Sequence, residues 1–395
     1  DIHIMIPAIT ETSPTQVLYM AFANALKATD FSGEICMDFA NRTVLATDNS
    51  IYQILPQGVV YPKNNDDLVI LTNLSSQKQY QQIVLSPRGG GTGTNGQSLT
   101  DGMVVDTSKH MNKILEINTQ DGWARVQCGV VKDQLNAEIE PHGYFFAPEL
   151  STSNRATVGG MINTDAAGQG SCSYGKTRDH VLALKTVLMD GSVLDTFAID
   201  EATLKQEQSK DNLAARIYQL VDDIDRNYKD EIKAIFPKLN RCLTGYDLAH
   251  IRDDNNHFCL NSILCGSEGT LGFISEAKIN LLPIPTKTAL VNLSYANFNA
   301  ALRDAKTIMS AGPTSIETID SRVLNLAKGD IIWESIAEFF PEDNTDKNTS
   351  KTTHKKSVEG INLIEFSADS DEELKASMQP LLEILNSDTS VSHAY

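Results

Sequence analysis

The stretch SPRGGGTGTNGQ at residues 86–97 has the composition of a loop that holds a phosphate group. A pyrophosphate is anionic, and it needs several backbone N–H donors on a surface that no side chain covers. Successive glycines leave such a surface open and adopt the positive φ angles of an anion-binding nest. Thr92 and Thr94 add hydroxyl donors and Asn95 adds an amide, while Arg88 would neutralise charge or brace the loop. The loop therefore predicts a phosphate site.

Two other interpretations of this loop are a flexible linker and a purely structural turn. A linker would lie between domains, whereas this loop lies between two apolar runs, residues 83–85 and 103–105, and follows the rigid Pro87. Phosphate binding is therefore the better prediction. The class of ligand stays open at this point. No lysine follows the glycines as it does in a P-loop, and a β-rich run follows them where a dinucleotide fingerprint would have a helix.

Helical and strand patterns alternate around this loop. Ser13 and Pro14 are typical of a helix start, and the spacing of the apolar residues after them predicts a helix over 14–28. Further helices are expected over 66–79, 131–141, 211–236 and 298–310, and strands over 58–61, 83–86, 103–106, 123–128, 289–295 and 315–318. Residues 180–189 and 192–196 predict a β-hairpin that turns at Asp190 and Gly191.

Three segments depart from this alternation. Residues 151–174 are rich in Ser, Thr, Asn, Ala and Gly, and they predict a long irregular segment of the kind that is usually functional in a compact domain. Pro283 and Pro285 predict a domain boundary. The hydrophilic residues 342–360 predict a mobile surface loop.

The composition excludes several classes of protein. A net charge of −18, from 33 basic and 51 acidic residues, opposes binding to nucleic acid. Neither a transmembrane stretch nor the apolar core of a signal peptide is present, so we expect a cytoplasmic protein, with peripheral attachment to the inner membrane left open. The six cysteines include no CxxC pair, which predicts reduced packing residues and neither a zinc site nor a disulfide framework.

A second stretch, PELSTSNRATVGGMINTDAAG at residues 148–168, decides the class of ligand. Together with PRGGGTGTNG, with YGKTRDHVLALKTVLMDG at 174–191 and with GSEGTLGFISEA at 266–277, it resembles the vanillyl-alcohol-oxidase-type, or PCMH-type, FAD-binding oxidoreductases. The four motifs stand in family order over roughly residues 40–285. Within this family the chain is most similar to the amino-terminal part of the large bacterial FAD and iron–sulfur dehydrogenases of D-2-hydroxy acids, such as D-2-hydroxyglutarate and D-lactate.

The resemblance implies an α+β fold. A two-subdomain, PCMH-type FAD-binding domain would occupy residues 1–282, with a helical extension over 1–40. Part of an α/β cap domain, the carboxy-terminal domain of FAD-linked oxidases, would occupy residues 283–395.

The resemblance also implies a cofactor role for each matching residue. The loop would hold the FAD pyrophosphate through its backbone amides, and the later motifs would form the wall along the flavin and adenine portions. The implied cofactor-binding residues are Arg88, Gly89, Gly90, Gly91, Thr92, Gly93, Thr94, Asn95, Pro148, Ser151, Ser153, Gly159, Gly160, Thr164, Gly168, Gly175 and Ile274. Some family members carry a histidine in the glycine loop that bonds covalently to the flavin. Because Thr92 stands in that stretch here, FAD is expected to be bound noncovalently.

Other polar residues are interpreted mainly as structural. His180 is expected to be a hydrogen-bonded structural histidine rather than a residue that faces the cofactor, and Glu268 to support the flavin site rather than to act in catalysis. Scaffold or solvent-facing roles are expected for Arg42, Asp48, Tyr52, Glu317 and Asp320.

The catalytic residues stay unassigned. The HxD-like element, the EH pair and the cysteine clusters that such dehydrogenases use are absent, while His354 lies in the polar stretch and His393 stands alone. We therefore expect a fragment of a longer protein, whose iron–sulfur cluster and divalent metal belong to a part beyond residue 395.

The function that the resemblance implies is the oxidation of a small D-2-hydroxy acid to the 2-oxo acid. A base would take the hydroxyl proton while hydride passes from C2 to flavin N5, and electrons would then pass through iron–sulfur centres to an unidentified acceptor. Two alternatives stay open: another FAD-dependent oxidase, of glycolate or a sugar lactone, and a non-catalytic nucleotide-binding module.

Overall fold

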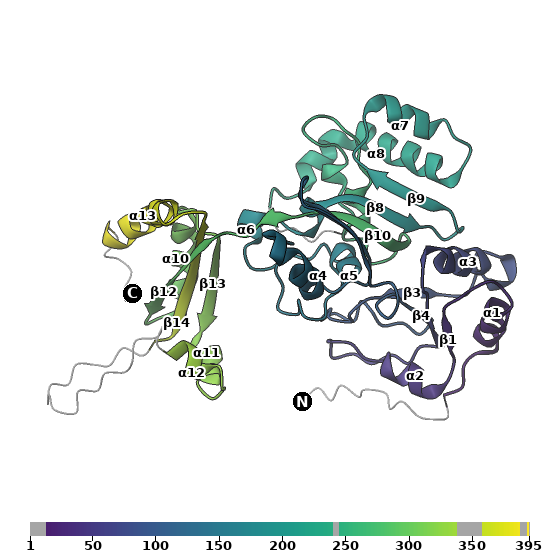
Figure 1. Cartoon of the computed structure of the whole chain (residues 1–395), viewed down its shortest axis with the longest axis horizontal. Coiled ribbons are helices and arrows are strands. Elements are labelled where there is room, and N and C mark those ends of the chain that lie inside the picture. The colour runs from purple at the N-terminus through teal and green to yellow at the C-terminus, as the bar shows by residue number, and fades with distance from the viewer. Residues whose placement is uncertain (1–12, 240–244, 338–357, 388–392, 395) are drawn as a thin grey trace. The chain divides into compact units, whose positions relative to one another are not determined.

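A computed structural model describes residues 13–239, 245–337, 358–387 and 393–394 of the chain (Figure 1). The chain divides into two compact units. The larger consists of Asp1–Gly168 and Lys176–Pro283, and the smaller of Gln169–Gly175 and Ile284–Tyr395. The larger unit thus ends beside the proline pair expected to mark a boundary.

The first subdomain of the larger unit contains a four-stranded sheet in the order β1-β2-β4-β3. Strands β2, β4 and β3 run parallel, and β1 pairs antiparallel with β2. The middle strands, GVVY and MVVD, are buried throughout, as is usual for parallel strands covered on both faces. The bounds are β1 (Glu34–Cys36), β2 (Gly58–Tyr61), β3 (Leu85–Arg88), β4 (Met103–Asp106), α1 (Val17–Lys27), α2 (Phe39–Val44) and α3 (Asn65–Ser75).

The second subdomain contains a five-stranded antiparallel sheet in the order β5-β6-β10-β8-β9. Strand β10, the last of these in the sequence, lies in the middle of the sheet between β6 and β8. The bounds are β5 (Ile114–Asn118), β6 (Trp123–Gln127), β8 (Val181–Val187), β9 (Val193–Phe197), β10 (Phe273–Asn280), α4 (Lys132–Ile139), α5 (Val158–Asn163) and α9 (Asn261–Leu264). A two-stranded ribbon joins β7 (Tyr144–Phe145) to β11 (Leu282–Pro283).

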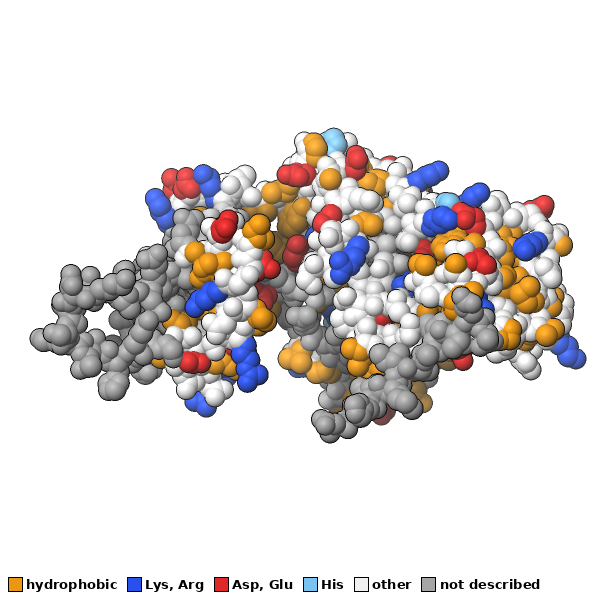
Figure 2. All heavy atoms as spheres, turned by 90° about the horizontal axis from the view of Figure 1, so that it is seen from below, with side chains coloured by type: hydrophobic (Ala, Val, Ile, Leu, Met, Phe, Trp, Pro, Cys, Tyr) orange, Lys and Arg blue, Asp and Glu red, His pale blue; other side chains and the backbone are white. Residues whose placement is uncertain are grey.

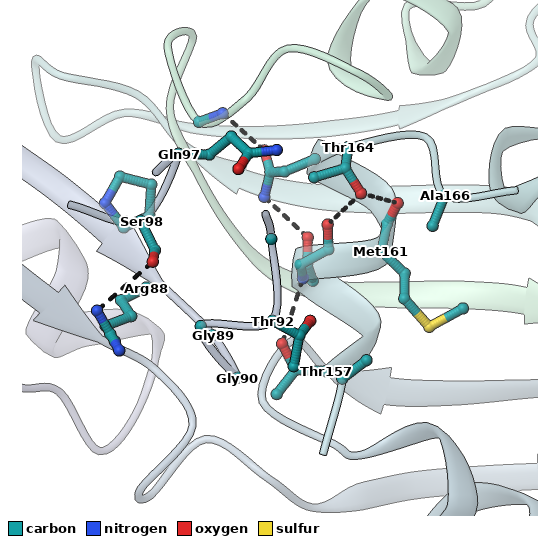
Figure 3. A pocket seen from close by; sticks show the side chains of 18 of the residues that line it. Arg88, Gly89, Gly90, Thr92, Gln97, Ser98, Thr157, Met161, Thr164 and Ala166 are labelled. Atoms are coloured by element: carbon teal, nitrogen blue, oxygen red, sulfur yellow. Dashed lines mark hydrogen bonds between the residues drawn. The ribbon is translucent and has the colours of Figure 1, made fainter. Parts of the chain in front are cut away.

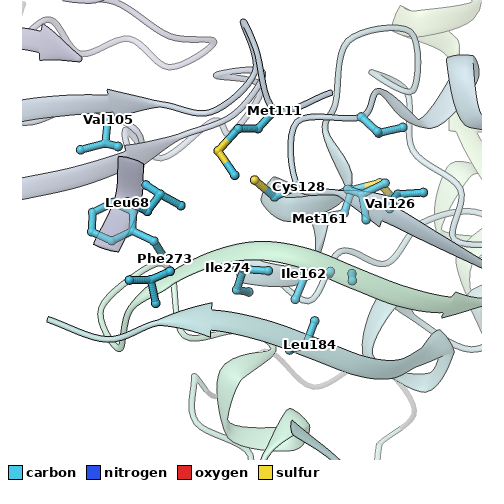
Figure 4. Close-up of a cluster of buried hydrophobic side chains, with 14 of the residues drawn as sticks. Leu68, Val105, Met111, Val126, Cys128, Met161, Ile162, Leu184, Phe273 and Ile274 are labelled. Carbon is cyan, nitrogen blue, oxygen red and sulfur yellow. The ribbon is translucent and has the colours of Figure 1, made fainter. Parts of the chain in front are cut away.

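One hydrophobic core connects the two subdomains. Leu68 and Val105 of the first subdomain and Val126, Leu184 and Ile274 of the second belong to the same buried cluster (Figure 4). Side chains packed in this way hold the loops between the sheets on a rigid base. The larger unit is therefore an α+β fold in two subdomains, as predicted.

A separate cluster lies under α7 (Glu201–Gln208) and α8 (Leu213–Ile235), which follow the hairpin of β8 and β9. Helix α8 begins at the cap Asn212, whose side chain accepts a hydrogen bond from the Ala215 N–H, and it is kinked at Tyr228. Arg252 joins these helices through ion pairs with Glu201, Asp222 and Asp225.

The smaller unit contains a four-stranded antiparallel sheet in the order β13-β14-β12-β15. Its core joins Leu293 and Phe366 of the sheet to Ile308 of α10 and Leu381 of α13. The bounds are β12 (Lys287–Tyr295), β13 (Ser315–Asp320), β14 (Gly360–Ala368), β15 (His393–Ala394), α6 (Ser171–Tyr174), α10 (Phe298–Met309), α11 (Ser321–Ala327), α12 (Trp333–Ile336) and α13 (Asp371–Ser387).

Most of the expected elements are confirmed within one to three residues, including the strand expected over 83–86, which spans Leu85–Arg88, and two expectations need correction. The helix expected over 66–79 ends four residues early, at Ser75. The segment over 151–174 is not irregular throughout, because it contains the short helices α5 and α6. Most of the hydrophilic stretch 342–360, with His354, lies outside the described residues.

On the face drawn in Figure 2, acidic, basic and hydrophobic side chains of the described residues are interspersed. No helix in the described ranges is both long and apolar enough to cross a membrane.

Candidate cofactor-binding site

The glycine loop forms one wall of a pocket in the larger unit. Residues of the 150–167 segment and of the 268–274 segment line most of the rest, and Thr107 and Cys128 contribute to it as well. Its volume of about 360 Å³ is within the range of ligand pockets. The two segments that the sequence singled out therefore meet at one cavity, although the 50 residues 98–147 separate them.

The pocket contains eleven of the predicted residues and leaves out six. The lining residues are Arg88, Gly89, Gly90, Gly91, Thr92, Gly93, Thr94, Gly159, Gly160, Thr164 and Ile274. The residues that do not line it are Asn95, Pro148, Ser151, Ser153, Gly168 and Gly175. A direct cofactor contact stays a prediction for all of them.

The glycine loop packs closely against residues 155–157. A β-carbon on Gly90 would lie 2.1 Å from the carbonyl oxygen of Arg155, and one on Gly89 would lie 2.2 Å from the Thr157 hydroxyl oxygen. Both distances are far inside van der Waals contact. The loop can therefore take this path only without side chains at these two positions.

The successive N–H groups of Gly90 to Thr94 donate no hydrogen bond to the described part of the chain. Gly91 has a φ of 61°, the left-handed conformation that turns adjacent N–H groups toward a common point. Its carbonyl oxygen accepts a hydrogen bond of 3.0 Å from the Asn49 N–H, which fixes the loop from behind. A row of such donors in a fixed loop fits the pyrophosphate of a dinucleotide.

Arg88 braces this loop. Its guanidinium donates to the carbonyl oxygens of Thr47, at 2.8 Å, and Leu45, at 3.3 Å, and lies 3.5 Å from the Ser98 hydroxyl (Figure 3). A β-carbon on Gly91 would lie 2.6 Å from this guanidinium, so the loop wraps around it. Burial lowers the pKa of Arg88. Of the two roles left open for Arg88, the geometry favours bracing over direct charge neutralisation.

Helix α5 forms the facing wall. Thr157 caps its first turn, and its hydroxyl oxygen accepts a hydrogen bond of 3.3 Å from the Gly160 N–H (Figure 3). The Thr164 hydroxyl donates back to the Gly160 carbonyl oxygen, 3.1 Å away. Asn163, the last residue of the helix, accepts hydrogen bonds from the N–H groups of Glu268 and Gly269. These contacts join α5 to the 268–274 segment, which forms the third wall of the pocket.

A buried ion pair lies just after the end of α5. The Lys176 ammonium lies 2.6 Å from the Asp165 carboxylate, and both side chains are almost fully buried. The other Asp165 oxygen accepts a hydrogen bond from the Arg178 N–H. Ala166 and Ala167, which line the pocket, follow Asp165 directly, and the Ala166 carbonyl oxygen accepts a hydrogen bond from the Thr177 N–H.

Several lining residues were not predicted. Within 148–153 the resemblance pointed to Pro148, Ser151 and Ser153, whereas Leu150 and Thr152 line the pocket. Others not predicted include Ala156, Thr157, Asn163, Ala166 and Ala167. Among these residues, Thr157 could have been identified from the sequence, because a threonine directly before VGG is a helix-start signal.

Glu268 lines the pocket from a strained backbone position. Its φ is 52°, a left-handed conformation that is uncommon for residues other than glycine, and its N–H donates to the Asn163 carbonyl oxygen at 2.9 Å. Desolvation raises the pKa of its carboxyl. The bond to Asn163 fits the supporting role expected of this residue, and no observation assigns it to catalysis.

The lining residues offer little nucleophilic chemistry. They include no histidine, and their one cysteine, Cys128, is buried. Burial raises the pKa of its thiol to about 11, so the thiol is neutral at physiological pH. Noncovalent binding of a flavin fits this set of side chains.

The other candidates have structural contacts. His180 is buried, and its ring packs edge-on against Phe146 at a centroid distance of 6.0 Å. Buried Arg42 donates to the carbonyl oxygens of Pro56 and Ser13. Of the remaining residues, Asp48 accepts a hydrogen bond from Ser98, Tyr52 lies beside Gly96, Glu317 is in β13 and Asp320 caps α11.

In the part of the chain that the structure describes, no group of three or more His, Cys, Asp or Glu side chains is arranged to hold a metal ion. His393 belongs to β15. The iron–sulfur and metal sites expected beyond this chain stay predictions.

The pocket fits a dinucleotide cofactor, and the comparisons identify an FAD-binding protein and its family. Residues 56–196 match the family "FAD binding domain", and residues 284–395 match "FAD linked oxidases, C-terminal domain". The chain belongs to the PCMH-type FAD-linked oxidase family, as the resemblance predicted.

The similar proteins include two bacterial enzymes named D-2-hydroxyglutarate dehydrogenase. The one from Pseudomonas putida is 54% identical over 98% of this chain and 37% of its own length. The one from Pantoea ananatis is 48% identical over 92% of this chain and 35% of its own length. The chain thus spans just over a third of these relatives.

A solved structure of alkyldihydroxyacetonephosphate synthase superposes on the chain with a TM-score of 0.66. The superposition covers 99% of this chain and 62% of the synthase chain, at 17% sequence identity. At this identity the likeness shows the fold alone.

Proposed function

We propose that this chain is the FAD-binding part of a dehydrogenase that oxidises a D-2-hydroxy acid, D-2-hydroxyglutarate or D-lactate, to the corresponding 2-oxo acid. The identity of 54% and 48% to two D-2-hydroxyglutarate dehydrogenases, over nearly the whole chain, supports D-2-hydroxyglutarate as the first substrate to test. The observation that carries FAD binding is the row of N–H donors from Gly90 to Thr94, which faces a pocket and has no acceptor in the described part of the chain.

The chain's own residues bind and orient the cofactor. The N–H groups of the glycine loop would hold the pyrophosphate, and Arg88 keeps the loop in shape through Thr47 and Leu45. Helix α5 presents Gly160 to the pocket, so a cofactor could approach the backbone closely there, whereas the bare Gly159 makes room for Cys128. FAD, when bound, supplies a hydride acceptor at flavin N5. The base that takes the hydroxyl proton is not assigned to a described residue.

Two further parts of the proposal concern the whole protein. Electrons would leave through iron–sulfur centres outside this chain toward an acceptor that is not identified. A cytoplasmic location is proposed as well, with attachment to the inner membrane left to experiment.

The test uses the whole protein as its own gene encodes it. Extraction and mass analysis of the bound ligand should yield unmodified FAD. Steady-state assays with an artificial electron acceptor should give the highest kcat/KM for a D-2-hydroxy acid among D-2-hydroxyglutarate, D-lactate and glycolate, with the L-enantiomers as controls. Absence of turnover with every D-2-hydroxy acid would contradict the proposed reaction. Absence of flavin in the protein would contradict the proposed site.

A further inference from the structure

Helix α8 is covered by the rest of the chain over only its first half. It lies beside α7 at the edge of the larger unit (Figure 1). Its buried residues are Ala215, Tyr218, Val221 and Asp222. In α8, all of which the structure describes, no residue after Asp222 is buried, although the helix continues to Ile235. The second half of α8, residues 224–235, therefore extends beyond the cluster that holds the first half.

One apolar stripe runs along both halves of the helix. In the first half, Ile217 and Val221 pack in the cluster under α7 and α8. In the second half the stripe continues, at spacings of four, four and three residues, with Ile224, Tyr228, Ile232 and Ile235. Of these, Tyr228 is 54% exposed and Ile235 is 68% exposed, and the other two are partly exposed. A stripe of the kind that usually faces a core thus lies open to solvent.

The charged residues of α8 also change along the helix. Its ion pairs end at Arg226, which contacts Asp222 and Glu201. The charged residues that follow in the helix form no ion pair with another described residue; they are Lys229, Asp230, Glu231 and Lys233. At 3.6 residues per turn, Lys229 and Glu231 border the stripe on its two sides. An apolar centre with a charged border is the usual pattern of a protein interface.

The second half of α8 has little support as a helix. Isolated helices shorter than about 12–15 residues are marginal in water, because most helical stability in proteins comes from packing of the apolar face. The first half of α8 can nucleate this segment, but it cannot cover the stripe. Since no described residue buries Tyr228, Ile232 or Ile235, the surface that covers them lies outside the described part of the chain.

The relatives indicate where that surface comes from. The D-2-hydroxyglutarate dehydrogenases from Pseudomonas putida and Pantoea ananatis match 98% and 92% of this chain, but the matches span only 37% and 35% of their own lengths. Nearly two thirds of each relative thus lies outside the matched part. A surface in the same polypeptide acts at an effective concentration of about millimolar, whereas a second molecule acts only at its own concentration. A partner in the same polypeptide is therefore favoured over a second copy.

We propose that residues 224–235 of α8 are a docking surface for the part of the polypeptide that lies outside residues 1–395. The partner surface is apolar opposite Tyr228, Ile232 and Ile235, and it carries an acidic group near Lys229 and a basic group near Glu231. This contact joins the larger unit to the rest of the protein. It shares no residue with the pocket and does not depend on the proposed binding of FAD.

The first test is amide hydrogen exchange in the whole protein as its own gene encodes it. We expect the amides of residues 228–235 to exchange about a hundredfold more slowly than in the variant Ile235→Lys, in which a charge enters the docked face. Ile235 is largely exposed in this chain, so the substitution leaves the core of the larger unit intact. The matched control is Ala234→Lys, at an exposed position of the same turn about 100° around the helix, which should keep the parental protection.

Two results of this test would overturn the inference. Exchange of residues 228–235 in the parent within about tenfold of unstructured amides would mean that the stripe stays in water. Equal loss of protection in Ile235→Lys and Ala234→Lys would mean that the protection does not depend on the stripe.

Crosslinking identifies the partner. An equal mixture of nitrogen-15-labelled and unlabelled whole protein is treated with an amine-reactive crosslinker, for which Lys229 and Lys233 provide the amines. We expect links of uniform isotope composition from these lysines to residues outside 1–395. Links between a labelled and an unlabelled α8 would assign the surface to a second copy and would overturn the inference.

Discussion

The pocket and the α7–α8 region differ in whether their polar groups have partners within the chain. In the pocket, the N–H groups of Gly90 to Thr94 and the carboxyl of Glu268 have no internal partner among the described residues. Beside α7 and α8, Arg252 lies 2.6 Å from Asp222, 2.8 Å from Asp225 and 3.4 Å from Glu201. Each of these four charges is paired within the chain.

The difference separates two uses of polarity. Groups paired within the protein add to the stability of the folded state and need nothing from outside. Donors held in a fixed geometry without an acceptor in the chain are hydrated until a ligand replaces the water. Changes in the pocket should therefore alter binding, and changes beside α8 should alter stability.

The largest effect is expected for Gly90→Val. Its side chain would collide with the Arg155 carbonyl oxygen and displace the loop, so more than one hydrogen bond to the pyrophosphate would be lost. Because each bond to a charged group contributes about 1.5–3 kcal/mol, FAD affinity should fall about a hundredfold or more in a fluorescence titration. Gly329→Ala is the control, since its β-carbon would lie 3.5 Å from its nearest neighbour, the Leu326 carbonyl oxygen. Unchanged FAD affinity in Gly90→Val would show that the glycine loop does not bind the cofactor.

Arg252→Met should reverse this pattern. Its side chain is 11% exposed and serves three carboxylates, so its loss leaves charges unpaired, and the free energy of unfolding should fall by about 2–4 kcal/mol. Urea unfolding measures this change, and FAD affinity should stay at the parental value. Arg226→Met is the matched control, because Arg226 also contacts Asp222 and Glu201 but is 51% exposed and should cost about 1 kcal/mol or less. A large loss of FAD affinity in Arg252→Met would contradict the expectation that changes beside α8 alter stability and not binding.

A smaller effect is expected in acid. Burial alone would raise the pKa of Asp222, but hydrogen bonds from Gln208, Arg226 and Arg252 lower it below its ordinary value. The stability that Asp222 contributes is therefore present above its unfolded pKa of about 4 and is lost as the pH falls through the lower, folded value. Urea unfolding below about pH 4 should show a shallower loss for Asp222→Asn than for the parent. Equal slopes of the free energy of unfolding against pH in the variant and the parent would contradict this account. Asp223→Asn, at an exposed site on the same helix, serves as control.

The smallest effect concerns the pocket thiol. With a pKa of about 11 and its side chain buried, Cys128 should resist iodoacetamide at pH 8, while the exposed Cys172 reacts. Peptide mass analysis distinguishes the two sites, and FAD affinity should not change on treatment. Rapid labelling of Cys128 would mean that this wall opens to solvent.

The glycine loop and its flanking strands were predictable because their signals are local. Three glycines after a proline, between two apolar runs, specify a short loop whatever the rest of the chain does. Helix α5 was missed, since Gly159 and Gly160 lower its helix propensity and only the cap Thr157 indicates a start.

The remainder of the site depends on contacts that sequence spacing does not encode. Arg88 is held by backbone carbonyls of Leu45 and Thr47, which any residue type provides. Within 148–153 the motif located the wall but not which side chains face inward, so Leu150 and Thr152 were missed. The left-handed backbone of Glu268 likewise results from its bonds to Asn163, about 100 residues earlier.

The order of the five-stranded sheet has a consequence for synthesis. Strand β10 pairs with both β6 and β8, yet it follows β6 by roughly 150 residues. At about 5–20 residues per second, the ribosome would leave the edge of β6 without that partner for roughly 7–30 s. Ile274 and Phe273, which complete the pocket, emerge with the same strand. We therefore expect the pocket to be complete only after β10 has been synthesised, and until then the unpaired edge of β6 is a site where aggregation could start.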